Sequence, residues 1–315
     1  MTQDNPASAT PHPVAFPYPG GIAVLTGAAS GFGLAAARLA AQHRMRILMA
    51  DVQEEALRAA ADELRAQGAA VTAVVTNVAD ASAVDALAQK TLQTYGVPNF
   101  VFNNAGVASG GLVWENTLAD WQWVLGVNLM GVVHGVHAFT PLMLEAAAHD
   151  PGWRGHLVNT ASMAGLVNMP NSGIYNVSKH AVVALTETLH QDLALVTEQV
   201  RCAVLCPFFV PTGISQSERN RPAPLSHGEL TRSQLVSRAM GAKAVARGKI
   251  SAETVIERVF SAVADGSFYI YSHPQALQSV RTRMEDILTP RPPTDPFIDR
   301  PDLGAQLRAA LRGES

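Results

Sequence analysis

The amino-acid sequence predicts an α/β protein with a doubly wound parallel sheet of about seven strands and helices on both faces. Short apolar segments alternate with segments of helical length from residue 21 onwards. The apolar segments contain very few polar residues, as strands do when both faces of a parallel sheet are covered. The first of them leads through a glycine-rich turn into an alanine-rich helix, which supports the same fold class.

Six predicted strands and the helices between them occupy the first two thirds of the chain. The strands are expected over residues 22–26, 46–50, 71–76, 99–102, 156–160 and 200–205, and the helices over 34–43, 54–67, 82–95, 118–143 and 175–197. A helix over 251–264, a last strand over 268–271 and a helix over 274–288 follow. Because parallel neighbours need long crossover connections, this order predicts βαβ units and a Rossmann-type fold.

One domain is expected over residues 21–275, because neither a Gly/Ser linker nor a fixed-period repeat divides the chain. Residues 1–20 contain five prolines and no apolar periodicity before Val14, which predicts a flexible N-terminal arm. Residues 213–250 interrupt the alternation, and a long irregular insertion is usually functional, so we expect a mobile substrate lid. Residues 276–315 are expected to form a C-terminal extension whose proline-rich part is draped over the surface.

The composition excludes several classes of protein. Hydrophobic residues make up 48% and charged residues 16%, which indicates a large dry core. A net charge of -3 offers no electrostatic footprint for nucleic acid. Cys202 and Cys206 lie too far apart on one strand for a disulfide and are expected to be reduced core thiols. Without a signal peptide or the roughly 18 apolar residues of a membrane span, a soluble cytoplasmic protein is expected.

The turn between the first strand and the first helix predicts a dinucleotide site. It contains Gly27, Ser30, Gly31, Phe32 and Gly33. Glycines allow a tight turn and let backbone N–H groups approach a pyrophosphate, which the N-terminus of the following helix also attracts. Its place between a strand and a helix distinguishes this turn from an ordinary glycine-rich loop.

Asp51 ends the second strand, 18 positions after Gly33. A carboxylate at this place can accept hydrogen bonds from the adenosine ribose hydroxyls, and it repels a 2′-phosphate. Val52 follows, so no arginine next in the sequence is ready to bind that phosphate. We therefore predict NAD and not NADP as the cofactor. The alternative is that Asp51 only caps the helix that begins at Glu54.

Three side chains after the fifth strand predict acid/base chemistry. Ser162 follows the strand, and Tyr175 and Lys179 lie four residues apart, on one face of the next helix. An ammonium group beside a phenol favours the phenolate and lowers the phenol pKa from about 10. Tyr175 is then able to exchange a proton with a substrate hydroxyl near neutral pH, while Ser162 hydrogen-bonds the same oxygen.

At this point the sequence resembles the short-chain dehydrogenase/reductase (SDR) superfamily in its compact single-domain form. The resemblance extends from Gly21 to about Thr212 and rests on the glycine spacing, on Asn103-Asn104-Ala105-Gly106 and on the serine, tyrosine and lysine above. It implies that Ser162 polarises the substrate oxygen and that Tyr175 is the acid/base. It further implies that Lys179 binds the nicotinamide ribose and lowers the tyrosine pKa, and that Asn128 holds a water linked to Lys179.

The resemblance also implies a set of cofactor contacts. These are Asn77, Val78, Asn104, Ala105 and Gly106 around the adenosine half, and Tyr175, Lys179, Pro207, Val210 and Thr212 toward the nicotinamide. Asn77 stands where the family often has an aspartate, and its amide oxygen can accept the same hydrogen bond. Phe208 replaces the glycine that commonly follows the proline, which places an aromatic ring near the nicotinamide end.

The leading functional prediction is an NAD-dependent oxidoreductase that interconverts a secondary alcohol and a ketone by hydride transfer. A bulky hydrophobic or aromatic substrate is expected, because the residues predicted to line its pocket are mostly apolar. They are Val107, Met163, Val167, Asn168, Phe208 and Phe209. The segment 214–222 and the length of the C-terminal extension are similar to those of dehydrogenases acting on benzylic alcohols of lignin-derived aryl ethers.

Two other functions remain open at this stage. A 3-oxoacyl thioester reductase would use the seven basic residues of 213–250 to attract an anionic carrier. A solvated or subunit-facing surface explains those residues more simply, and Asp51 argues against the phosphorylated cofactor that such reductases mostly prefer. A non-catalytic dinucleotide sensor would not need Ser162 or Tyr175, yet both are present.

The resemblance implies a homodimer or homotetramer, because the family usually pairs its fourth and fifth helices between subunits. His134 and His137 are three residues apart on a predicted helix, but the sequence shows no third ligand beside them, so no metal site is expected. A small-molecule alcohol or ketone is the expected partner, and neither nucleic acid nor a membrane is expected.

Overall fold

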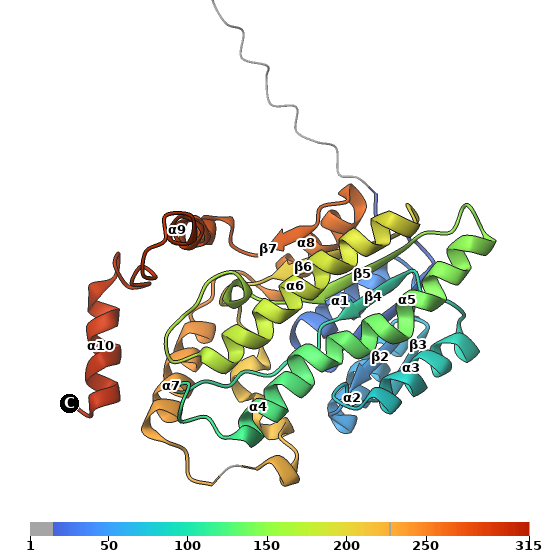
Figure 1. The fold of residues 1–315 in the computed structure, drawn as a ribbon. Helices are drawn as coiled ribbons and strands as arrows, with labels where there is room; N and C mark the ends of the chain where they lie inside the picture. The colour runs from blue at the N-terminus through green and yellow to red at the C-terminus, as the bar shows by residue number, and fades with distance from the viewer. Residues whose placement is uncertain (1–14, 227, 315) are drawn as a thin grey trace, which may run out of the picture.

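A sheet of seven parallel strands forms the centre of the protein, in the order β3-β2-β1-β4-β5-β6-β7 (Figure 1). The structure, a computed structural model, describes residues 15–226 and 228–314, and the sheet is counted within them. The strands are β1 (Ile22–Thr26), β2 (Arg46–Asp51), β3 (Val71–Val75), β4 (Phe100–Asn103), β5 (Gly155–Thr160), β6 (Val200–Cys206) and β7 (Tyr269–Tyr271). The predicted Rossmann-type sheet of about seven strands is confirmed.

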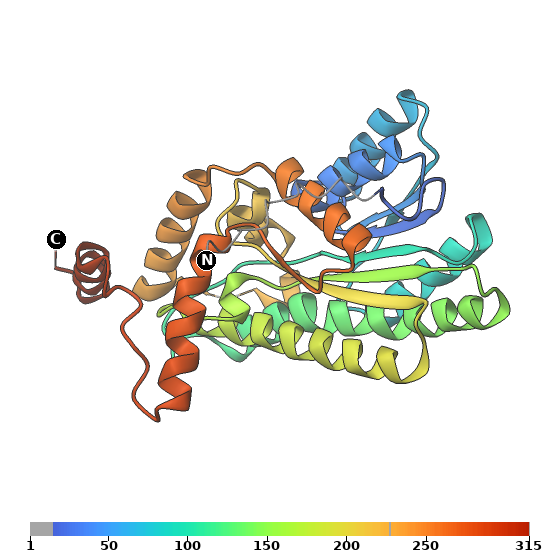
Figure 2. The same ribbon diagram turned by 90° about the horizontal axis from the view of Figure 1, so that it is seen from above.

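Helices cover both faces of this sheet (Figure 2). In chain order the long helices are α1 (Gly31–Gln42), α2 (Glu54–Ala66), α3 (Ala81–Thr94), α4 (Leu118–Leu125), α5 (Gly131–His149), α6 (Gly173–Val196), α7 (Arg232–Ala246), α8 (Ala252–Asp265), α9 (Leu277–Leu288) and α10 (Pro301–Arg312). Short helical turns are Met163–Gly165, Gly213–Asn220 (η3), Ala223–Leu225 and Pro274–Ala276. The two layers follow from the sequence, because successive strand residues point to opposite faces.

Strand β1 illustrates how the two cores are divided. Ala23 and Leu25 pack with α1, α2 and α8 on one face, whereas Val24 packs with α3, α5 and α6 on the other. All three are fully buried, so both faces of the strand are dry. Cys202 and Cys206 are buried and free, and burial raises the pKa of each thiol to about 12. The prediction of reduced core thiols is confirmed.

The direction of the chain across the sheet reverses next to β1, and this reversal places the site. The chain adds β2 and β3 on one side of β1 and then returns to pair β4 with its other side. In parallel sheets a crevice forms outside the carboxyl ends of the strands at such a switch point. The turns after β1, β2, β4, β5 and β6 therefore meet at one edge.

A π-helical turn, Gly126–Met130, joins α4 to α5 in one continuous helical rod. This rod, Leu118–His149, is long and apolar enough to satisfy the criteria for a membrane span, with a mean hydropathy of 1.3. The sequence analysis did not anticipate such a stretch. Trp123, Phe139 and Met143 of the rod are nevertheless buried in the protein core, so the apolar composition is explained by packing on the sheet.

Residues 15–20 differ from the expected flexible arm. Phe16 and Tyr18 are buried, and the Phe16 ring stacks on Phe260 of α8 with 4.4 Å between centroids. His43, at the end of α1, lies against the same ring. The expectation of flexibility is therefore wrong for this part, while residues 1–14 lie outside the described residues.

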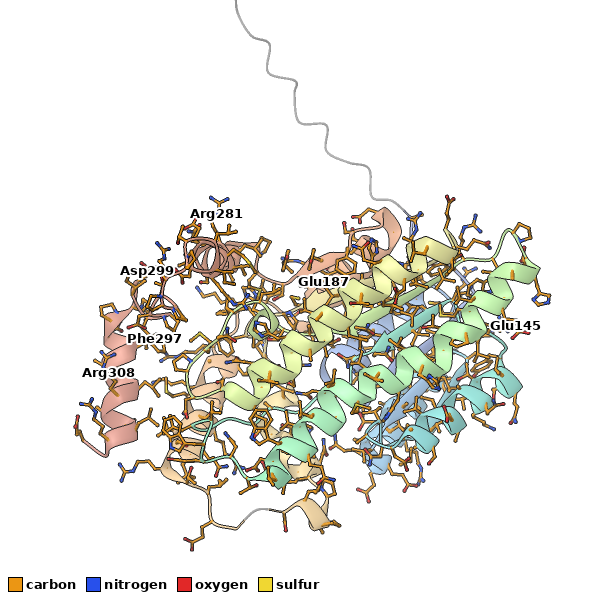
Figure 3. All side chains as sticks on the ribbon, viewed as in Figure 1. Glu145, Glu187, Arg281, Phe297, Asp299 and Arg308 are labelled. Carbon is orange, nitrogen blue, oxygen red and sulfur yellow. The ribbon has the colours of Figure 1, made fainter. Side chains whose placement is uncertain are left out.

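The segment 213–250 is not an irregular insertion. Its backbone is mostly helical, with η3, the turn Ala223–Leu225 and α7. The sequence analysis missed α10 in the C-terminal extension, where Leu307 is buried and the helix lies beside α7. The prolines before it mark the connection from α9, in which Figure 3 labels Phe297 and Asp299. The C-terminal extension therefore borders the predicted lid.

Candidate active site

The glycine turn after β1 is too tightly packed for other side chains. Gly27 has φ +65°, and a Cβ atom there would lie 2.9 Å from Ala105 Cα. A Cβ on Gly33 would lie 2.1 Å from the Gly27 carbonyl oxygen. Glycine is required at both positions, because the start of α1 and the loop after β4 both approach the turn backbone. The turn thus forms a cradle of the kind that fits a pyrophosphate at a helix N-terminus.

Asp51 joins the end of β2 to this cradle. Its Oδ2 accepts a hydrogen bond from Ala29 N and its Oδ1 one from Gln53 N, each 3.0 Å long. The carboxylate is buried and lines the same cleft as the turn. It therefore orders the glycine turn as well as the entry to α2, which is more than the alternative of helix capping alone would require.

Thr26 organises the loop after β4 and was missed by the sequence analysis. Its hydroxyl accepts hydrogen bonds from Asn104 N and Ala105 N, at 2.9 and 3.1 Å. Asn104 Nδ2 donates to the Thr26 carbonyl oxygen, 2.9 Å away. A threonine at the last position of an apolar strand is the signal that was available. These bonds hold Asn104, Ala105 and Gly106 beside the glycine turn.

Asn77 and Val78 lie on the same side of the cleft, after β3. Asn77 Oδ1 accepts a hydrogen bond from Ala79 N, which fixes the turn. His134 Nδ1 on α5 lies 2.9 Å from the Val78 carbonyl oxygen. His134 therefore supports this loop, and no group of three metal-ligating side chains occurs among residues 15–226 and 228–314.

Ser162, Tyr175 and Lys179 come together where β5 and α6 meet the cleft. Ser162 Oγ accepts from Ala164 N at 3.1 Å and donates to the Pro207 carbonyl oxygen at 3.3 Å. Tyr175 and Lys179 lie in the first two turns of α6, with Lys179 Nζ 5.8 Å from the centre of the tyrosine ring. Lys179 Nζ donates to the Thr160 carbonyl oxygen at 2.9 Å. The predicted trio is therefore assembled.

Burial decides the proton affinities of this trio. It raises the pKa of Tyr175, and hydrogen bonding to Ser162 opposes that rise only in part. It lowers the pKa of Lys179 to about 8, because the ammonium form loses its hydration. The pKa of Tyr175 is thus raised overall in the protein chain by itself, and the lowering effect that the resemblance implies for Lys179 stays a prediction.

Asn128 lies in the π-helical turn and is fully buried behind the cleft. Its Oδ1 accepts from Val107 N at 2.8 Å, and its Nδ2 donates to the Val107 carbonyl oxygen and to Ser178 Oγ. A π-helical turn is often found at functional sites, because the extra residue re-aims a side chain. Asn128 ties the loop after β4 to α6, and its link to Lys179 through water stays a prediction.

The cleft has a volume of about 1700 Å³. Of the predicted cofactor and catalytic residues, only Gly33 and Asn128 lie outside its lining, each directly behind it. The predicted substrate residues also line it: Val107, Met163, Val167, Asn168, Phe208 and Phe209. Phe208 and Phe209 pack edge to face with 4.7 Å between ring centres, and Phe208 contacts His273 in the same way. The substrate part of the cleft is thus largely apolar and aromatic.

Residues of segment 213–250, the predicted lid, also line the cleft, and the segment is held in place by polar contacts that were not predicted from the sequence. Arg221 is buried, forms an ion pair with Asp120 of α4 at 2.7 Å and lies over the Trp123 ring. Burial by itself would raise the pKa of Asp120, but hydrogen bonds from Arg221 and Thr117 lower it. Gln234 of α7 donates to the same carboxylate. No local pattern signals these pairs, because their members are about 100 positions apart or more.

A family model supports the assignment that this geometry suggests. The model for short chain dehydrogenases matches residues 21–223, which include the glycine turn and the serine, tyrosine and lysine positions. The chain belongs to the short-chain dehydrogenase family. The lid from residue 224 onwards and the C-terminal extension lie outside the match.

This short-chain dehydrogenase is similar to proteins of known name along most of its length. A dehydrogenase/reductase of CLA biosynthesis from Lactiplantibacillus plantarum is 31% identical over 87% of this chain and 96% of its own length. A 1-deoxy-11-beta-hydroxypentalenate dehydrogenase from Streptomyces arenae is 36% identical over 87% and 90%. The crystal structure of a short-chain dehydrogenase from Burkholderia phymatum in complex with NAD has a TM-score of 0.87 and 49% identity over 90% and 99%.

Proposed function

We propose that this short-chain dehydrogenase interconverts a secondary alcohol and a ketone with NAD(H) as the cofactor. The observation that carries the proposal is that Ser162, Tyr175 and Lys179 line the same cleft as the glycine turn and Asp51. The NAD in the Burkholderia phymatum structure and the dehydrogenase names of the other two relatives support it. The glycine cradle and the Asp51 carboxylate fit a dinucleotide without a 2′-phosphate.

The chain's own residues supply the proton chemistry and the positioning. NAD supplies the acceptor for the hydride, and its oxidised nicotinamide ring has a positive charge. Ser162 hydrogen-bonds the substrate oxygen, and Tyr175 Oη, as the phenolate, takes the hydroxyl proton during oxidation and returns it during reduction. The positive charge of a bound oxidised nicotinamide would favour this phenolate and offset the burial that raises the Tyr175 pKa. Lys179 is held by the Thr160 carbonyl oxygen at the base of the trio, where it faces the ring of Tyr175.

The lining of the cleft favours a bulky hydrophobic or aromatic substrate. Phe208 and Phe209 are 46% and 40% exposed although they are aromatic, so their rings are available to a ligand in the cleft. Met163 and Val167 line the same cleft. Benzylic alcohols are therefore the first class to test. The name of the Streptomyces relative, a 1-deoxy-11-beta-hydroxypentalenate dehydrogenase, suggests hydroxylated carboxylates as the second.

The thioester reductase is a weaker proposal after the lid contacts are considered. That proposal relies on the seven basic residues of segment 213–250. Of these, Arg221 is buried against Asp120, and Arg238 is paired with Glu218. Charges that are neutralised within the chain attract an anionic carrier poorly. The homodimer or homotetramer stays a prediction, and so does the non-catalytic dinucleotide sensor.

The decisive experiment follows reduced nicotinamide by absorbance with NAD and NADP in parallel, against aliphatic, benzylic and 3-hydroxyacyl alcohols. Tyr175→Phe removes the proton acceptor and keeps the ring, so we expect kcat to fall by about 10²- to 10⁴-fold. NADH affinity should fall far less than kcat, because the ring still fills its place and only one predicted cofactor contact is removed. Binding without turnover on every alcohol, in the wild type, would favour the sensor.

A further inference from the structure

Arg219 crosses from the lid to the cofactor side of the cleft. It lies in η3, and its Nε donates to Gln53 Oε1 at 2.9 Å. Gln53 is two residues after Asp51 and starts the entry to α2. The two partners are 166 positions apart, so only the fold brings this guanidinium to the groove. The sequence analysis found no arginine next to Asp51, yet the lid supplies one from a distance.

The guanidinium is fixed in orientation by its own segment. Nη1 donates to the carbonyl oxygens of Gly213 and Gln216, at 3.1 and 2.7 Å. Nη2 has no hydrogen bond to any of the residues that the structure describes, so its two donors are available. Because hydrogen bonds at Nε and Nη1 already fix the guanidinium, it loses little conformational entropy when an anion binds its free edge, Nη2.

The free edge lies beside the glycine turn. A Cβ atom on Gly213 would lie 3.3 Å from Arg219 Nη2 and 3.9 Å from Ser30 Oγ, so all three surround one place. Next to it, a Cβ on Gly31 would lie 3.4 Å from Thr212 Cβ. The strip between residues 212–213 and residues 30–31 is thus narrow and lined by the N-terminus of α1. This is where a pyrophosphate would lie on a glycine cradle.

Segment η3 is hydrogen-bonded to residues on both sides of the groove, and we therefore call it a bridge. One end is bound to Gln53, after β2, through Arg219. Nearer its middle, Ser217 is buried and its hydroxyl accepts from Ala108 N at 2.8 Å and donates to the Ala108 carbonyl oxygen at 3.3 Å. Ala108 follows β4, on the other side of β1. The bridge therefore passes over the glycine turn between them.

We propose that Arg219 binds the pyrophosphate of the dinucleotide, so that η3 closes over the bound cofactor. This inference rests on the proposed NAD cofactor. The two N–H groups of Nη2 can each donate a charge-assisted hydrogen bond to a phosphate oxygen, and this free edge faces the cradle in which those oxygens would lie. The adjacent Asp51 carboxylate makes the ribose side of the groove unfavourable for a 2′-phosphate, which leaves the pyrophosphate as the anion for Arg219.

The test measures binding of NADH by its fluorescence, and of ADP-ribose and adenosine by competition, to the full chain. For Arg219→Gln we expect affinity for NADH and for ADP-ribose to fall about tenfold, which corresponds to ~1.4 kcal/mol. Adenosine, which lacks the pyrophosphate, should bind as it does to the wild type. NADH should also dissociate faster from the variant in stopped-flow measurements, because the bridge is no longer held to the cofactor. Arg219→Lys should recover part of the lost NADH affinity, since lysine keeps the positive charge but lacks the planar set of N–H donors.

Arg238→Gln is the matched control, because Arg238 also lies in segment 213–250 and, within the described part of the chain, forms its ion pair with Glu218. It should leave NADH affinity unchanged. Unaltered NADH affinity in Arg219→Gln would overturn the inference, and so would an equal loss for adenosine, which would make Arg219 a support for Gln53. A loss confined to NADPH would assign it to a 2′-phosphate. If the wild type binds no NADH at all, the proposed function itself fails.

Discussion

The two walls of the cleft are held in different ways. The cofactor wall is built from strand ends and their turns, where Thr26 and Asp51 accept hydrogen bonds from backbone N–H groups of adjacent loops. The lid wall is held by contacts between distant parts of the chain. Arg221 pairs with Asp120, Ser217 bonds Ala108, and Ser233 Oγ donates to Glu115 at 2.6 Å.

This difference indicates how the two walls behave. Backbone groups on buried parallel strands have no freedom to move apart without loss of the sheet, so the cofactor wall is preorganised. Segment 213–250 is instead held by a few side-chain pairs, and its opening as a lid stays a prediction. If it opens, a substrate pocket that shares η3 with the cofactor groove would admit both ligands and close over them.

Removal of the buried lid ion pair should have the largest effect on stability. Arg221→Met leaves Asp120 as an unpaired buried carboxylate, which typically costs about 3–5 kcal/mol. Arg238→Met breaks an ion pair whose side chains are 46% and 32% exposed, and should cost less than about 1 kcal/mol. Urea denaturation of both variants measures the difference. Equal losses would show that the lid is not held by its buried pair.

The second largest effect on stability should be its dependence on pH through Lys179, at the cofactor wall. The pKa of Lys179 is lowered from 10.5 to about 8, so the unfolded chain binds more protons than the folded one between these values. The contribution of Lys179 to stability should therefore rise with pH from about 8 to about 10.5, by an amount on the order of 3 kcal/mol, whereas the buried Cys202 and Cys206 thiols act in the opposite direction above pH 9. Lys179→Met should lack this contribution. Thermal unfolding of the wild type and of Lys179→Met across that pH range measures this contribution. The same pH dependence in both proteins would contradict a lowered Lys179 pKa.

Asp51→Asn should have the smallest effect and should leave the lid untouched. The amide loses the charge and can keep only one of the two hydrogen bonds from Ala29 N and Gln53 N, so we expect NADH affinity to fall about tenfold and the preference over NADPH to narrow. The control is Asp62→Asn on α2, which removes only an exposed ion pair with Arg65. A variant that binds NADH as the wild type does, with NADPH still excluded, would show that Asp51 orders the turn without contacting the ribose.

Local patterns were sufficient for most of the fold and for the cofactor wall. The alternation of apolar and helical segments predicted the strands of the sheet, and the glycine turn, Asp51 and the Tyr175/Lys179 spacing predicted residues that line one cleft. Such features are readable because each lies within one turn or one strand end, where residue type and spacing dictate geometry. Parallel strands then bring the ends together without further information.

Only the tertiary structure decided the lid, the buried part of the arm and the proton affinities. Arg219, Arg221 and Phe16 have no local pattern that names Gln53, Asp120 or Phe260 as their partners. The pKa of Tyr175 is raised where sequence spacing predicted a lowering, because spacing shows which groups are near but not how deeply they are buried. Spacing along the chain determines local geometry, whereas desolvation and long-range pairing exist only after the chain has closed on itself.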